Sequence, residues 1–446
     1  MRGRGSNLRS GCNLGPRAGY PPNMNHSLLR SGFLLCSLLV LAPAAPAQTG
    51  ELAEKDQQAL GKVLNKFLGA KAGDKDKEKA RVDFGKELEK LGKKKGQKDT
   101  TEAHVAALGL TADLGRALYF ATEYKLNLRG GKPINEELAQ VPKTSYALSL
   151  PSTYRPGGAP LPLILAIPEF KDGKPVSPSE FLTAHLNEQE IREGAAIAAV
   201  PMPANKDDWN LLKEDRSGGI AMVMFTWGDV IGKVGIDANR IYLYGRGTEA
   251  VTAAMHVATR YPHRFAGVIG VSGDAAADIA PTNFGNLPTF FAAAGSNAST
   301  FETKAKELGY GNCTLKADGT AADVWAWIGK TARVPNPLKV TFQPGDPFPD
   351  RAYWVRIPAT TGLATPVVAE ADRATNTIKV KVPDVRQVTL LFNAELIDFA
   401  KPVNIEINGK ARTEKIVPSV DDMLGLLPQS DNGRVYVTQR TYEVTQ

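Results

Sequence analysis

The chain has 446 residues, of which 43% are hydrophobic, so it is long enough for two or three domains with substantial cores. Its net charge is +7, but residues 1–47 contain five arginines and no acidic residue, and removing these five charges leaves +2. This small remainder argues against nucleic acid as a partner, because most of the basic excess lies in the leader. Only Cys313 follows the leader, which excludes an intrachain disulfide in the rest of the chain.

Residues 1–47 are predicted to be a leader that contains a signal peptide. Phe33–Leu41 is its apolar core and Ala45–Ala47 a small-residue cleavage site, while Met24 is a candidate for the true start. The core is shorter than the roughly 20 residues that span a bilayer. We therefore expect an exported protein, periplasmic or extracellular, without an integral membrane segment after signal removal.

Residues 48–142 are predicted to be a helical, charged region. Apolar residues there recur at the spacing of one helix face, namely Leu60, Val63, Leu64, Phe67 and Leu68. Lys71–Lys79 alternates lysine with acidic residues. This pattern is typical of a solvated helix face, and a polymer-binding patch is the less favoured interpretation.

Residues 143–333 alternate predicted strands with predicted helices. Alternation of this kind favours an α/β fold with a doubly wound, mostly parallel sheet. The helices include Ser217–Val234 and Thr248–Arg260. The predicted strands are Tyr146–Leu150, Leu161–Ile167, Ala195–Val200, Ile241–Tyr244, Phe265–Val271 and Thr289–Ala294.

Residues 338–446 are predicted to form a β-sandwich domain, hinged at the proline-rich segment Val334–Pro337. Short strands with alternating polarity follow one another here, and Asn408 with Gly409 is a hairpin signal. The predicted strands are Tyr353–Ile357, Pro366–Ala369, Thr377–Val382, Gln387–Phe392, Val403–Ile407, Val435–Val437 and Tyr442–Val444.

The most informative stretch is Ile241–Ala250, where an apolar strand runs through a Gly-x-Gly turn into a helix rich in small residues. With its surroundings, above all Asp237–Gly273, this stretch resembles secreted α/β-hydrolases of the esterase, polyhydroxybutyrate-depolymerase and prolyl-oligopeptidase-like groups. The resemblance covers roughly residues 143–330 and implies an α/β-hydrolase fold. In such enzymes the turn reads Gly-x-Ser-x-Gly and holds the nucleophilic serine.

The resemblance also implies a degenerate catalytic triad. Gly247 stands at the nucleophile position, Asn297 in the loop that should carry the acid, and Ala322 at the position of the base. No histidine follows His263, and Glu169 replaces the usual glycine of the oxyanion loop, where a carboxylate would oppose a developing oxyanion.

Three functional hypotheses follow. The first is an exported, non-catalytic pseudo-esterase that binds or scaffolds an envelope glycan, a polymer or a protein. The second is an active esterase or peptidase with a displaced nucleophile, for which the nearby hydroxyls are Thr248, Ser272 and Ser296. Thr248 is, however, expected to cap the following helix.

The third and weakest hypothesis is a dinucleotide-binding enzyme. It rests on the Gly-x-Gly-x-x-Ala pattern from Gly245 to Ala250, with Asp274 after the next strand. The sequence shows no spacing of metal ligands and no interleaved basic and aromatic residues. We therefore predict no metal, no other cofactor and no nucleic-acid partner.

Overall fold

A computed structural model of the chain describes residues 52–444, except for residues 71–74, 95–110, 213–217, 345–349, 359–364 and 383–384. The predicted leader and His104 lie outside the described residues. Within the described ranges, no helix combines the length and the apolar character needed to cross a membrane.

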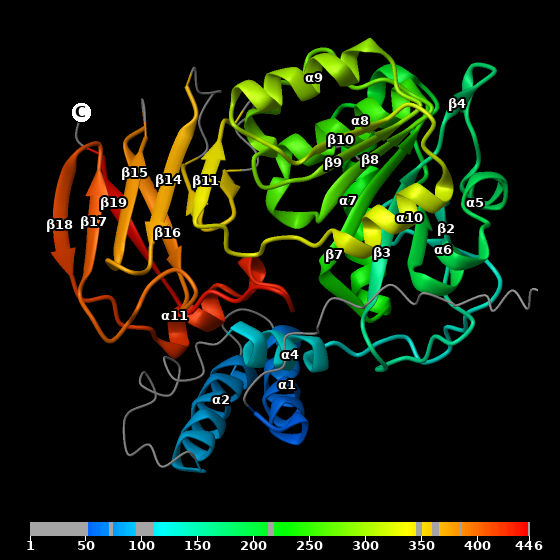
Figure 1. Cartoon of the computed structure of the whole chain (residues 1–446). Coiled ribbons are helices and arrows are strands. Elements are labelled where there is room, and N and C mark those ends of the chain that lie inside the picture. Colours follow the sequence, from blue (N-terminus) through cyan, green and yellow to red (C-terminus); the bar gives the residue numbers. More distant parts are fainter. Residues whose placement is uncertain are drawn as a thin grey trace, which may run out of the picture. The chain divides into compact units, whose positions relative to one another are not determined.

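The first part of the described chain is helical, as predicted. Its helices are α1 (Glu54–Gly69), α2 (Lys75–Lys94) and α4 (Thr111–Ala121) (Figure 1). Leu60 and Leu64 of α1 are fully buried and share a core with Phe84 and Leu88 of α2. Of the apolar stripe read from the sequence, Leu60 and Leu64 are buried, Val63 and Phe67 are half-buried and Leu68 is exposed, and the lysines at other positions of these helices are mostly exposed.

An eight-stranded sheet occupies the middle of the chain, in the order β1-β2-β6-β3-β7-β8-β9-β10. Its strands are β1 (Ile134–Glu137), β2 (Ser145–Ser149), β3 (Leu161–Ile167), β6 (Ala196–Ala199), β7 (Ile236–Arg246), β8 (Gly267–Val271), β9 (Thr289–Ala292) and β10 (Cys313–Lys316). β1 pairs antiparallel with β2, and β2 pairs antiparallel with β6. From β6 onward in the sheet order, all neighbouring strands pair parallel. The predicted α/β class with a mostly parallel sheet is confirmed.

Helices cover both faces of this sheet (Figure 1). One core contains apolar residues of α7 (Gly219–Lys233), α8 (Thr248–Arg260) and α9 (Ser296–Glu307). The other contains residues of α5 (Pro178–His185), α6 (Gln189–Gly194) and α10 (Ala321–Lys330). Between these two layers, Leu163–Ile167 of β3 is buried on both sides, which explains its unbroken apolar sequence.

The sequence missed several features of this region. β1 lies within the segment assigned to the helical region, and β10 was not expected at all. Both are edge strands whose residues alternate between partial burial and exposure, so they lack a continuous apolar run. A short hairpin of two-residue strands, β4 (Phe170–Lys171) and β5 (Lys174–Pro175), also follows β3.

The carboxyl-terminal part consists of two antiparallel-rich sheets. The first contains β11 (Lys339–Phe342), β14 (Val367–Asp372), β15 (Thr377–Lys381), β17 (Val403–Ile407) and β18 (Lys410–Glu414). The second contains β12 (Arg351–Ala352), β13 (Val355–Arg356), β16 (Gln387–Phe392) and β19 (Thr438–Glu443). Asn408 and Gly409 have φ angles of 50° and 80° and form the predicted hairpin turn between β17 and β18.

Two strand predictions in this part were wrong. Tyr353–Ile357 is not one strand, because the chain turns at Tyr353, whose φ is 52°, and β12 pairs with β13 as a short hairpin. Val435–Val437 is buried but does not form a strand. An unexpected helix, α11 (Val420–Gly425), places Met423 and Leu424 in the core of the amino-terminal helices.

The predicted hinge at Val334–Pro337 is anchored by side chains on both sides of it. Asn336 is buried, donates to Glu395 Oε2 at 2.8 Å and accepts from Asn393 Nδ2 at 2.9 Å. The indole of Trp354 donates to the carbonyl of Pro337 at 2.7 Å. These bonds hold the segment in one conformation, and whether it separates independent domains remains a prediction.

Candidate functional site

The turn between β7 and α8 has the form of a nucleophile elbow but a backbone that only glycine adopts readily. Gly247 has φ 81° and ψ 157°, in a region of backbone space populated almost solely by glycine. Gly273 lies directly behind the turn, because a Cβ added to it would come within 2.3 Å of the carbonyl carbon of Gly247. The turn is therefore fixed by its neighbours as well as by its own conformation.

Thr248 does not cap α8, contrary to expectation. The N-cap is Gly247, and Thr248 is the first helical residue. Its hydroxyl instead accepts a hydrogen bond from the backbone N–H of Asp274 at 3.2 Å. Thr248 thus ties the elbow to the loop after β8.

Asp274, the acidic residue of the dinucleotide hypothesis, is used within the fold. Its carboxylate accepts backbone N–H bonds from Asn297 at 3.0 Å, Ala298 at 2.9 Å and Ala275 at 2.9 Å. The first two donors belong to the opening turn of α9, whose N–H groups need such acceptors. With these bonds in place, the carboxylate has little capacity left to bind a ribose hydroxyl.

The positions predicted for the acid and the base, Asn297 and Ala322, lie in segments that come after strands of the sheet, but they do not form a triad. Asn297 lies in the first turn of α9 and Ala322 in the first turn of α10. Ser272 and Ser296 are exposed. Within the described part of the chain, neither serine hydroxyl nor that of Thr248 is hydrogen-bonded to a histidine. No activated nucleophile of the Ser–His type is therefore present at these positions.

The sequence analysis missed a polar cluster beside the elbow, formed by Glu169, His185 and Arg246. Glu169 Oε1 lies 3.1 Å from His185 Nε2, and Glu169 Oε2 lies 3.6 Å from Arg246 Nε. A Cβ at Gly247 would meet the Cβ of Glu169 at 3.4 Å. These side chains are 22–28% exposed, so the cluster borders solvent directly at the nucleophile position.

His185 was overlooked because the triad order of hydrolases places the base after the nucleophile in the chain, and His185 precedes it. It ends α5, where its ring packs 5.2 Å from that of Phe181. The signal that could have found it is spatial: the loop carrying Glu169 and the helix carrying His185 both follow β3. A carboxylate paired with an imidazole can orient a polar ligand or exchange a proton.

The other described histidines do not contribute to this cluster. His256 lies in α8, and its Nε2 is 3.3 Å from Oδ2 of Asp278, which does not belong to the cluster. His263 is buried in the turn after α8, and its pKa is well below the usual range because of burial and the neighbouring Arg351. Among the described residues, no three or more His, Cys, Asp or Glu side chains are grouped so that they could hold a metal ion.

No protein-family model matches this chain, and no curated protein matches its sequence. Similar solved structures include a thermostable esterase, with 16% identity, a TM-score of 0.35 and coverage of 45% of this chain and 63% of that chain. A puromycin-hydrolyzing peptidase of Mycobacterium tuberculosis shows 11% identity and a TM-score of 0.33 over 45% of this chain and 40% of its own. MPT51 of Mycobacterium tuberculosis shows 13% identity and a TM-score of 0.34 over 45% and 98%.

The chain thus spans less than two thirds of the first two structures. The class of the protein follows from its own geometry: a mostly parallel sheet covered on both faces, with a strand–turn–helix elbow after a central strand. It has an α/β-hydrolase-type fold.

Proposed function

We propose that this protein is an exported, non-catalytic member of the α/β-hydrolase fold class, with a binding or scaffolding function. The observation that carries the proposal is Gly247, which occupies the nucleophile position of the elbow and has no side chain to react. Its φ of 81° and ψ of 157° keep the strained turn on which hydrolases of this fold hold their serine. The elbow therefore keeps its turn but lacks the nucleophile.

The position of Glu169 supports the same proposal. Its side chain lies against the place where a nucleophile would project, and its carboxylate faces His185 and Arg246. Acyl transfer needs hydrogen-bond donors aimed at the developing oxyanion, whereas a carboxylate at this place would repel the negative charge. The cluster suits recognition of a polar ligand better than catalysis of acyl transfer.

The partners we propose are those that reach an exported protein: an envelope glycan, an ester-containing polymer or another protein. Export itself rests on the apolar segment Phe33–Leu41 and the small residues Ala45–Ala47. Amino-terminal sequencing of the protein secreted from a bacterial host tests it. A mature chain that begins at Gln48 is expected, and a chain found in the cytoplasm with its leader intact would contradict export.

The alternative is an active hydrolase with a displaced nucleophile, and the Glu169–His185 pair is the observation that favours it. The 3.1 Å contact would allow the carboxylate to orient the imidazole as a general base. This alternative requires one of the hydroxyls of Thr248, Ser272 or Ser296 to react.

Hydrolysis of p-nitrophenyl butyrate separates the two functions. For the proposal, wild type and the variants Thr248→Val, Ser272→Ala, Ser296→Ala and His185→Ala should give the same background rate. Ser299→Ala is the matched control, because Ser299 is an exposed serine of α9. Saturable hydrolysis that one of the four test variants abolishes, and the control does not, would establish the displaced nucleophile instead.

A further inference from the structure

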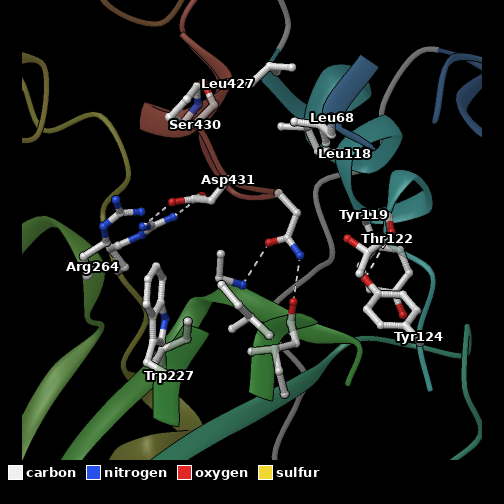
Figure 2. A pocket seen from close by; sticks show the side chains of 17 residues that line it. Leu68, Leu118, Tyr119, Thr122, Tyr124, Trp227, Arg264, Leu427, Ser430 and Asp431 are labelled. Carbon is white, nitrogen blue, oxygen red and sulfur yellow. Dashed lines mark hydrogen bonds and ion pairs between the residues drawn. The ribbon is translucent and has the colours of Figure 1, made fainter. Parts of the chain in front are cut away.

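A second site lies at the opposite, amino-terminal end of β7, in a cavity of about 370 Å³. This volume is near the lower end of the range for small-molecule pockets, roughly 300–1,000 Å³. Its walls come from the amino-terminal helices with the segment after α4, from the α7–β7 region and from the segment 427–432, and they are completed by Arg264 after α8 and Arg333 after α10. Figure 2 shows Tyr119 and Tyr124 on one side and Arg264 with Trp227 on the other.

Most of the wall is apolar or aromatic, and its polar groups are largely engaged. The Tyr119 hydroxyl donates to the carbonyl of Gly158 at 2.6 Å, and the Tyr124 hydroxyl donates to the carbonyl of Tyr119 at 3.0 Å. Asn432 donates to Ile236 O at 2.7 Å and accepts from the backbone N–H of Ala238 at 2.9 Å. The two tyrosines therefore offer their rings to the cavity, and the wall is already ordered.

Two arginines line the cavity, and they differ in their partners. Arg333 donates to both carboxylate oxygens of Asp431, at 2.7 and 2.9 Å, and to the side chain of Asn239. The side chain of Arg264 makes no hydrogen bond to any described residue, and its guanidinium carbon lies 4.9 Å from the centroid of the Trp227 ring. Its Nε atom is buried without a partner. Arg264 therefore places a positive charge in the wall of an apolar cavity without a hydrogen-bonding counter-ion.

The surroundings add to this positive charge. Arg351 and Arg434 are buried and do not line the cavity, and Asp431 lies within 3.5 Å of Arg434 as well as of Arg333. Burial, together with the charge of Arg434, lowers the pKa of Arg264 to about 10. Because buried charges need partners, an anion in the cavity would relieve this imbalance.

We propose that this cavity binds an amphiphilic carboxylate, with its apolar or aromatic body between Trp227 and Tyr119 and its carboxylate on the guanidinium of Arg264. A carboxylate matches the planar fork of a guanidinium. A phosphate dianion fits less well, because Asp431 also lines the cavity and would repel the second negative charge. The inference is independent of the proposed function at the elbow and would hold even if the elbow were catalytic.

Calorimetric titration of the mature protein with octanoate and with uncharged octanamide tests the inference. Octanoate should bind at one site with a Kd of about 10 μM to 1 mM, and octanamide should bind at least about ten times more weakly. The variant Arg264→Met should remove this tenfold preference. Arg386→Met is the matched control, since Arg386 is an exposed arginine that does not line the cavity.

A second pair of variants avoids the buried arginine. Leu68 is 53% exposed and lines the cavity, so both Leu68→Glu and Leu68→Lys should fold. The glutamate variant should weaken octanoate binding severalfold, and the lysine variant should not. Equal affinities of wild type for the two probes, no saturable binding of octanoate, or equal octanoate binding by the Leu68 variants would each overturn the proposal.

Discussion

The two ends of β7 use charged residues in opposite ways. At its carboxyl end, the carboxylate of Glu169 contacts the imidazole of His185 and the guanidinium of Arg246 beside an elbow that lacks a nucleophile. At its amino end, Arg264 faces a cavity without a hydrogen-bonding partner. At the end where hydrolases of this fold react, Arg246 thus has the carboxylate of Glu169 as an ion-pair partner, whereas Arg264 forms no ion pair with a described residue; the Nε atoms of both arginines are buried without a hydrogen bond. The comparison shows that the fold indicates where a functional site is expected, whereas the partners of individual side chains decide the chemistry of that site.

The largest effect should come from breaking the ion pair between Arg333 and Asp431 in the wall of the cavity. The Arg333 side chain is 1% exposed, and Asp431→Asn would leave this guanidinium buried without its counter-charge. We expect a loss of about 3–5 kcal/mol in the free energy of unfolding, measured by urea denaturation. Glu169→Gln at the elbow end is the comparison and should cost less than about 1 kcal/mol, because that pair is partly exposed. Equal losses in the two variants would contradict the contrast between the two ends.

Lowering the pH should destabilise the protein through two groups, His263 and Asp431. Burial and nearby arginines hold the pKa of His263 well below its usual range, and Arg333 and Arg434 lower the pKa of Asp431. Both groups bind protons more readily in the unfolded chain, so each stabilises the fold above its unfolded pKa and loses this contribution as the pH falls. Stability should therefore decline below about pH 6.5 and more steeply below about pH 4. In unfolding curves across pH, His263→Gln should remove the first decline and Asp431→Asn the second; unchanged profiles would contradict this assignment.

An intermediate effect is expected at the elbow turn. Gly247→Ala should destabilise the protein by about 1–3 kcal/mol, because its backbone conformation is strained for any residue with a Cβ. Gly228→Ala is the control: this glycine lies in α7 with open space around it, and alanine there should be neutral or stabilising by up to about 1 kcal/mol. Thermal unfolding of the two variants gives the comparison. If Gly247→Ala were as stable as Gly228→Ala, the elbow would be able to accept serine.

The smallest effect concerns the imidazole of the elbow cluster. His185→Gln keeps a side chain that can hydrogen-bond to Glu169 and should change the free energy of unfolding by less than about 0.5 kcal/mol. Chemical denaturation measures the change, with His185→Phe as the partner variant that cannot form the bond. A large loss in His185→Gln would mean that the cluster is a structural element of the fold rather than a recognition surface.

The sequence predicted the regular parts of this molecule well. The helix Thr248–Arg260 and the strand Leu161–Ile167 have the predicted bounds, because small residues and an unbroken apolar run leave few other structures open to them. It missed β1 and β10, whose edge positions leave them half exposed.

The sites were harder to predict than the strands. Gly247 could be placed at the elbow from local sequence alone. The contact of Glu169 with His185 joins residues 16 positions apart through the chain's return after β3, and the cavity around Arg264 joins residues from Leu68 to Asn432. Such arrangements depend on tertiary packing, which no local pattern records.

The central claim, that the elbow carries no nucleophile, is tested most directly by covalent labelling. Intact-mass spectrometry after incubation of the protein with a fluorophosphonate probe, beside an active serine hydrolase as positive control, should show an unmodified mass for this protein. The variant Gly247→Ser should stay unmodified as well, because the carboxylate of Glu169 beside the new side chain would oppose the developing negative charge. Stoichiometric labelling of the wild-type protein, abolished by replacing one hydroxyl residue, would contradict the account.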